Sequence, residues 1–257
     1  MAQNRYAQYG TAARAGAAVD EGLRAYMLGV YNYMAAGVAL TGIVAYFVSS
    51  LATTTDPSLA MAQLANGVML TQLGSTLYSS PLRWVVMLAP LGFVLFMSFR
   101  AQKMSVGATQ ICFWLFAGLM GLSLSSIFLV FTGQSITQIF FITAGAFAGL
   151  SLWGYTTKKD LSGWGSFLIM GVVGIIIAAL VNLFLQSGAL QFAISVIGLL
   201  VFAGLTAYDT QRIKDGYLLV RNDATMVAKS AIMGALSLYL DFINMFLFML
   251  QLFGNRQ

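Results

Sequence analysis

Seven long apolar runs, separated by short polar connections, constrain this chain more than any other feature. A helix that crosses a bilayer needs about 20 mostly apolar residues. With 59% hydrophobic and 8% charged residues, the chain lies outside the range of soluble domains. The runs are Met27–Leu51, Trp84–Phe99, Val106–Phe131, Ile136–Thr156, Trp164–Leu185, Leu190–Gln211 and Ala231–Phe253. They predict an all-α membrane protein: a bundle of seven transmembrane helices over residues 27–257, after a flexible cytoplasmic tail over residues 1–26.

The basic residues predict the orientation of the bundle, because cytoplasmic loops of membrane proteins carry an excess of Lys and Arg. With the N-terminus in the cytoplasm, only Arg83 and Arg256 lie outside. Eleven basic residues then lie inside: Arg5, Arg14, Arg24, Arg100, Lys103, Lys158, Lys159, Arg212, Lys214, Arg221 and Lys229. We predict a multi-pass protein with its N-terminus in the cytoplasm. Nucleic-acid binding is a poor explanation of the positive charge, because the charge is divided among short loops.

Two features interrupt the pattern of spans. The connection Ala52–Ser80 is too polar for an eighth span, and we expect its weakly amphipathic part to lie along the outer interface. The second run has only sixteen residues, which reach about 24 Å against a hydrocarbon core of about 30 Å. Arg100, at its end, is therefore either an interfacial anchor or a residue that reaches into the bundle.

Small residues at four-residue spacing predict where helices pack closely in lipid. The third run contains Ala117, Gly121 and Ser125, and the fourth contains Gly145 and Gly149. We interpret both sets as helix-packing positions without chemistry of their own.

Asp241 is the only charged residue of the last apolar run. A carboxylate at the centre of a spanning helix costs about 2.5–3.5 kcal/mol on insertion scales, so it indicates a functional site. It lies about 18 Å along the helix from Lys229, near the middle of the membrane. Steps of four and three residues place it on one polar stripe of the helix, which comprises Ser230, Gly234, Ser237, Asp241 and Asn244. Such a stripe is either enclosed by neighbouring helices or lines a wet path.

Asp209, near the end of the preceding run, is the candidate partner of Asp241. Arg212 follows it by one helical turn, so an ordinary interfacial ion pair is the alternative. If the two carboxyl groups approach, they cannot both ionise easily and would share a proton near neutral pH. The deprotonated pair, with Asn244 and neutral oxygens, would form a weak Ca²⁺ or Mg²⁺ site. Arg100 and Arg212 are the cations that could hold a carboxylate as a latch.

Several motifs resemble the bacterial branch of the Bax inhibitor-1 family, also called the transmembrane Bax inhibitor motif family. The strongest are GLTAYDTQRIK at Gly204–Lys214, GALSLYLDFIN at Gly234–Asn244 and FGNR at Phe253–Arg256. Shorter matches occur at Gly22–Met27, Gly121–Ser126 and Gly154–Gly163. The resemblance covers nearly the whole chain from about residue 20, although the loop before the second helix is unusually long.

The resemblance implies a multi-pass protein of the bacterial inner membrane: a seven-helix bundle with the last helix central, a cytoplasmic N-terminus and a pH-sensitive calcium leak. In that family an Asp on each of the last two helices forms a hydrogen-bonded pair that senses pH, and these positions match Asp209 and Asp241. An Arg on the second helix pairs with the sixth-helix Asp as a latch, and Arg100 matches it by location. Ser237, Gly234, Asn244 and Arg212 are the candidates for lining the path.

Three other functions stay open. The first is a non-transporting membrane regulator, including an adaptor of a membrane-anchored protease. The second is an intramembrane aspartyl protease, since Tyr208–Asp209 resembles presenilin-like enzymes, but Leu238–Leu240 replaces the Gly-x-Gly expected before the second Asp. The third is a proton-coupled carrier. We expect no enzyme and no cofactor; the expected partners are the lipid bilayer, calcium and protons.

Overall fold

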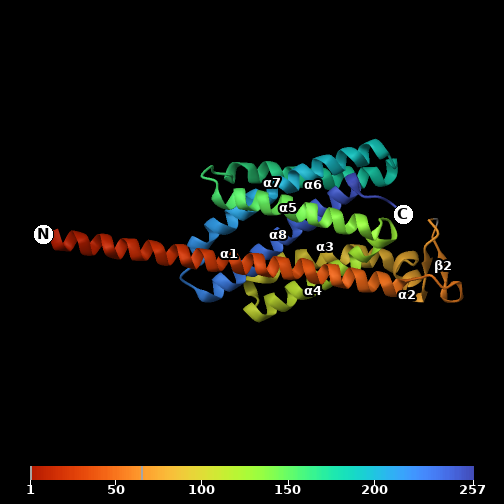
Figure 1. Cartoon of the computed structure of the whole chain (residues 1–257), viewed down its shortest axis with the longest axis horizontal. Coiled ribbons are helices and arrows are strands. Elements are labelled where there is room, and N and C mark those ends of the chain that lie inside the picture. The colour runs from red at the N-terminus through yellow and green to blue at the C-terminus, as the bar shows by residue number, and fades with distance from the viewer. Residues whose placement is uncertain (1, 65) are drawn as a thin grey trace.

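The computed structural model describes residues 2–64 and 66–257, apart from the side chains of residues 2–20 and 102, and it contains the seven predicted spans (Figure 1). The long helices are α1 (Ala2–Ala52), α3 (Leu82–Arg100), α4 (Val106–Leu124), α5 (Gly133–Thr156), α6 (Ser162–Leu185), α7 (Gly188–Val220) and α8 (Ala224–Phe253). Within α1, the apolar span covers Glu21–Ala52. The all-α membrane fold is therefore confirmed. Most of the predicted tail, residues 1–26, falls where side chains are not described, so its flexibility stays a prediction.

The helices run past the apolar segments at several ends. The sixth run was predicted to end at Gln211, whereas α7 continues to Val220. Helix α8 begins at Ala224, seven residues before the last run, because the carboxylate of Asp223 accepts hydrogen bonds from the backbone N–H groups of Thr225 and Met226. Hydropathy marks the part of a helix that lies in lipid, whereas capping residues and turns decide where the helix ends.

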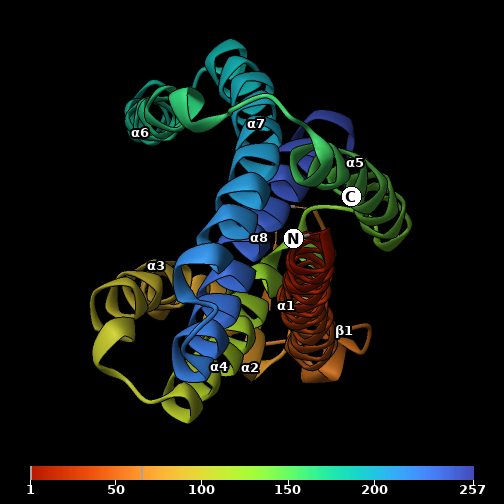
Figure 2. The ribbon, with the colours of Figure 1, turned by 90° about the vertical axis from the view of Figure 1, so that its left-hand side faces the viewer.

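Helix α8 is the central element of the bundle. In the apolar segment of α8, 67% of the residues are buried. The corresponding share is 33% in α1, α5 and α7 and 11% in α3 and α6. Helices α1, α4, α5 and α7 pack around it, while α6 packs mainly on α7 and α3 mainly on α4 (Figure 2). A helix that is enclosed in this way can carry polar groups that lipid would not tolerate.

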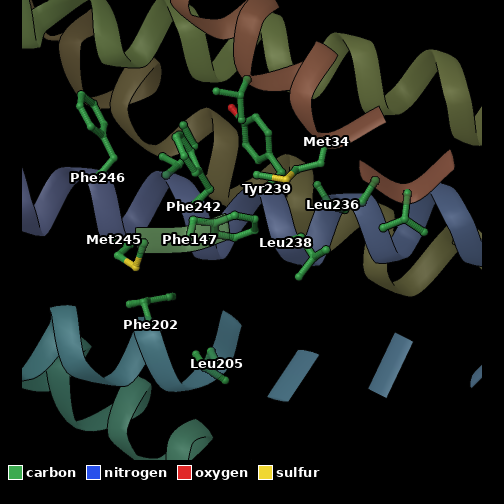
Figure 3. Packing of buried hydrophobic residues seen from close by; sticks show 14 of the residues in the cluster. Met34, Phe147, Phe202, Leu205, Leu236, Leu238, Tyr239, Phe242, Met245 and Phe246 are labelled. Atoms are coloured by element: carbon green, nitrogen blue, oxygen red, sulfur yellow. The ribbon is translucent and has the colours of Figure 1, made fainter. Parts of the chain in front are cut away.

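Aromatic side chains fill the space between α8 and its neighbours. Tyr239 is fully buried, and its ring lies edge-on to those of Phe113 and Phe116 on α4. Its hydroxyl is 2.7 Å from the hydroxyl oxygen of Thr41 on α1. Figure 3 shows Tyr239 on one side of α8 and Met245 on the other, where it faces Phe202 of α7. The central helix is thus anchored by packing on opposite faces.

Close helix contacts occur at some of the predicted small residues but not at others. A Cβ on Gly121 would come within 2.8 Å of the Thr41 carbonyl oxygen, so this glycine brings α4 and α1 together as predicted. The prediction for Gly145 and Gly149 is wrong, since a Cβ at either would meet nothing within 4 Å. The close contact on α5 is made instead by Gly154, which lies against the backbone of Ala207 on α7. The buried face of α5 passes through Gly154 and leaves the other two outside.

The connection between α1 and α3 forms a small folded cap. Its strands β1 (Thr53–Thr54), β2 (Ala62–Gln63) and β3 (Met69–Leu70) make an antiparallel sheet in the order β1-β3-β2. The helical turns η1 (Pro57–Leu59), α2 (Gln72–Gly74) and η2 (Ser75–Ser79) complete it. We expected an amphipathic stretch in this segment. The polar residues that suggested an amphipathic helix lie instead in short strands and turns. One of these turns has a positive φ of 88° at Gly67.

The last residues of the chain form a second contact at the same end of the bundle (Figure 1). The N–H of Gln257 donates to the carbonyl of Val130 at 2.9 Å, and the N–H of Thr132 donates to the carbonyl of Asn255 at 3.0 Å. The guanidinium of Arg256 lies over the ring of Phe131. We call residues 254–257 the C-terminal clamp. It fixes the end of α8 to the turn between α4 and α5.

Candidate carboxylate site in the central helix

Asp241 occupies the interior of the bundle. Its side chain is 4% exposed, and its Oδ2 is buried with no hydrogen-bond donor among the described residues. The neighbours along the helix, Tyr239 and Phe242, are also buried. An ionised carboxylate without a partner is very unfavourable in such a place. The site therefore requires a proton, a cation or a donor from elsewhere.

Asp209 lies on α7, which packs against α8, and it is 8% exposed. Two ionised carboxylates have no donor between them, so a hydrogen bond between the two groups needs one shared proton. The unpartnered Oδ2 of Asp241 is the atom that such a proton would serve. The structure places the two predicted residues, both buried, on helices that pack together, and their contact and proton sharing stay predictions.

Arg212 is the cation next to Asp209. Its Nη2 is 3.5 Å from Oδ1 of Asp209. The contact is looser than the 2.7–2.9 Å of a strong charge-assisted bond, and the Arg212 side chain is 53% exposed. Its guanidinium also lies over the ring of Tyr208. The interfacial ion pair that the sequence left open is thus present in this conformation.

Arg100 lies apart from this site. It is exposed at the end of α3, and α3 packs mainly on α4. Within the described part of the chain it makes no ion pair. The structure therefore does not bring Arg100 to Asp209 in this conformation, and its role as a latch stays a prediction that needs a movement of α3.

The polar stripe of α8 is enclosed along only part of its length. Gly234 is buried against Ile213 of α7, and the hydroxyl of Ser230 is 2.9 Å from that of Tyr26. Ser237 and Asn244, on either side of Asp241, are half-buried. The Nδ2 of Asn244 donates to its own helix, at the Leu240 carbonyl. Buried positions, Gly234 and Asp241, thus alternate along the stripe with half-buried ones, Ser230, Ser237 and Asn244.

The described residues contain no cluster of three or more acidic, histidine or cysteine side chains that could hold a metal ion. A cation at Asp209 and Asp241 would therefore depend on two carboxylates and neutral oxygens. Ca²⁺ prefers six to eight oxygens. The donor set fits a weakly held, exchanging ion and does not fit a resident metal.

A partly buried chain of hydroxyl groups, which sequence reasoning missed, holds α7 beside Asp209. The hydroxyls of Tyr31 and Ser151 are 2.7 Å apart, and that of Ser151 is 2.9 Å from Thr210, which donates to the Thr206 carbonyl. On the same helix, Gln211 binds the backbone of the α5–α6 turn at Lys159 and Leu161. Hydroxyl residues within apolar runs were a visible signal, but their partners depend on how the helices pack.

The fold and the site define a class: an all-helical, multi-pass membrane protein with a buried carboxylate on its central helix. The chain matches the family described as inhibitor of apoptosis-promoting Bax1 over residues 23–257. It therefore belongs to the Bax inhibitor-1 family, as its motifs predicted.

Three bacterial relatives align with almost all of the chain. Inner membrane protein YbhL of Escherichia coli K12 is 44% identical over 239 residues, which are 92% of this chain and 94% of the relative. An uncharacterized protein of Caulobacter vibrioides is 45% identical over 98% of this chain and 97% of its own length. Protein RP147 of Rickettsia prowazekii is 44% identical over 93% of this chain and 92% of its own length. The family membership thus applies to the whole membrane domain.

Proposed function

We propose that the protein is a pH-sensitive calcium leak of the bacterial inner membrane, with its N-terminus in the cytoplasm. Asp209 and Asp241 form the pH sensor and gate. The observation that carries the proposal is the buried, unpartnered Oδ2 of Asp241 at the centre of the bundle. The distribution of basic residues supports the orientation. The inner-membrane location is supported by the seven spans and by the name of the E. coli relative.

The mechanism follows from counting charges around the pair. When the pair holds a shared proton, its single negative charge is balanced by Arg212, and the interior is close to neutral. Loss of the proton leaves two carboxylates against one cation. The two carboxylates then repel each other and attract a divalent cation, which the half-buried Ser237 and Asn244 on either side of Asp241 would help to solvate. Flux therefore increases as pH rises through the titration of the pair.

The first experiment measures Ca²⁺ entry into liposomes that contain the purified protein. The pH, equal on both sides, is varied from 6 to 8, and empty liposomes give the background. One titrating group changes its ionised fraction by up to about tenfold per pH unit, so we expect flux to rise about five- to tenfold over this range. Folded protein without flux above background at any pH would contradict the leak. It would favour the alternative, a membrane regulator or an adaptor of a membrane-anchored protease.

The two candidate latch residues can be separated by their effects on the pH profile. Removing the cation in Arg212→Gln makes ionisation of the pair harder, so the midpoint of the flux curve should move to higher pH. Exposed ion pairs contribute about 0.2–1 kcal/mol, which equals a shift of about 0.1–0.7 pH unit. Arg100→Gln should leave the midpoint unchanged if the described conformation is the gating one. A larger shift for Arg100→Gln than for Arg212→Gln would establish Arg100 as the latch.

A further inference from the structure

A long apolar groove lies between α1 and α5. These two helices lie on the side of the bundle away from α3 and α6 (Figure 2). We call the groove the α1–α5 groove. Its volume is about 580 Å³. Met34 and Val38 of α1 form one wall, Ala144, Phe147 and Ala148 of α5 form the other, and Phe242 of α8 closes the bottom. Helices α1 and α5 both pack on α8 and make few contacts with each other. The groove between them is therefore open toward the lipid.

The groove is continuous along the bundle. A second cavity of about 370 Å³ shares Val38, Ala39 and Phe140 with the first and continues to Thr41 and Thr137. From Arg24 to Ala39 the first cavity follows α1 for about 22 Å at 1.5 Å per residue. This exceeds the depth of one leaflet, which is half of a hydrocarbon core of about 30 Å.

The shape of the groove favours one kind of occupant. Its volume of about 580 Å³ extends over about 22 Å of α1, and the residues that line it are mostly apolar. A long, narrow apolar groove of this kind fits a hydrocarbon chain.

The two ends of the continuous groove differ in charge. At one end Arg24 lines the first cavity, is exposed and makes no ion pair with any described residue. Tyr155 lines the same end, and Lys214 donates to its carbonyl at 2.9 Å with the ammonium 5.7 Å from the ring centre. The residues that line the second cavity carry no charge. An elongated ligand with one anionic end and one apolar end matches this polarity.

We propose that the α1–α5 groove is a binding site for one anionic phospholipid of the cytoplasmic leaflet. One acyl chain lies along α1 and α5 against Phe147 and Phe242, and the charged headgroup is held by Arg24 with Lys214 nearby. The hydroxyls of Tyr31 and Ser151 line this groove and continue to Thr210, the residue after Asp209. An occupied groove therefore supports the segment of α7 that carries the carboxylate. The proposal does not depend on ion transport.

The test is native mass spectrometry of the full chain released from micelles that contain equal amounts of phosphatidylglycerol and phosphatidylcholine with identical chains. We expect one retained phosphatidylglycerol per protein. Ala148→Trp and Ala35→Trp, which fill the groove from opposite walls, should reduce its retention at least about tenfold, whereas Ala179→Trp on the exposed face of α6 should not. A basic residue near the surface contributes about a fivefold preference for anionic lipid, so Arg24→Gln should reduce the preference by about that factor and Lys103→Gln should not.

Three results would overturn the proposal: equal retention of the two lipids by the unaltered protein, unchanged retention in both groove-filling variants, or an equal loss in Ala179→Trp. The thermal unfolding temperature of each variant separates lost binding from lost folding. Because the two groove-filling substitutions lie on different helices, failure of one variant to fold leaves the other as the test.

Discussion

Asp241→Asn is expected to remove the pH dependence of Ca²⁺ flux between pH 6 and 8. The amide has nearly the shape of the protonated carboxyl group but cannot ionise, so the pair stays in its low-flux charge state at every pH. Flux should remain at about the value that the unaltered protein shows at pH 6, a loss of about five- to tenfold at pH 8. Ion entry into liposomes, measured at a series of pH values, checks this directly.

Asp160→Asn is the matched control for this experiment. Asp160 lies in the turn between α5 and α6, where hydrogen bonds from the hydroxyl and the backbone N–H of Ser162 hold its pKa below the usual value. It is therefore ionised throughout the range tested, and an amide oxygen keeps the capping bond. The same charge is removed without a change in titration, so the pH profile should be retained. A normal pH profile in Asp241→Asn would rule out this carboxyl group as the sensor.

Tyr239→Ala is expected to produce the largest loss of stability of any single substitution considered. The ring is fully buried between α8, α4 and α1, and its hydroxyl contacts Thr41. Truncation of a buried aromatic side chain to alanine costs about 3–5 kcal/mol, from lost contacts and the cavity that remains. The free energy of unfolding in detergent, or the thermal unfolding temperature of the protein in micelles, measures this effect.

Two substitutions separate packing from hydrogen bonding at this position. Tyr239→Phe keeps the ring and removes one hydrogen bond, worth about 0.5–1.5 kcal/mol. Thr41 is not orphaned in that variant, because its hydroxyl also donates to the carbonyl of Ala117. Tyr46→Ala, at a position that is 60% exposed, should change stability by less than either. A Tyr239→Ala protein as stable as Tyr239→Phe would show that the ring is not part of the packed centre.

The parts of the fold that follow from hydropathy were predictable, and those that follow from contacts between distant residues were not. Apolar runs located all seven spans, because each span must satisfy its backbone within itself and face lipid. The strands of the cap are only two residues long, which is too short for a periodic pattern in the sequence. Their partners are also distant in sequence: Thr53 pairs with Leu70, seventeen residues later. Gly145 and Gly149 carried a packing pattern but lie on the outer face of α5.

The candidate site divides in the same way. The isolation of Asp241 in an apolar run was enough to predict a functional carboxylate near the middle of the membrane, on a stripe that is either enclosed or lines a wet path. The structure shows the side chain buried. The sequence alone could not decide which arginine lies beside Asp209. Arg212 is on the same helix, one turn away, whereas Arg100 is on α3, which packs mainly on α4. The α1–α5 groove had no sequence signal, since its walls are ordinary apolar residues and only the spacing of the helices creates it.

The C-terminal clamp limits how the bundle can change shape. Helix α8 is held at one end by residues 254–257 and is joined at the other end to α7 through a turn of three residues. It therefore cannot slide along its own axis like a piston without breaking backbone hydrogen bonds at the clamp. A rearrangement around the carboxylates would therefore involve movement of the surrounding helices relative to a fixed α8. The peripheral helices α3 and α6 have the smallest share of buried residues, so they have the fewest packing contacts to lose in such a rearrangement.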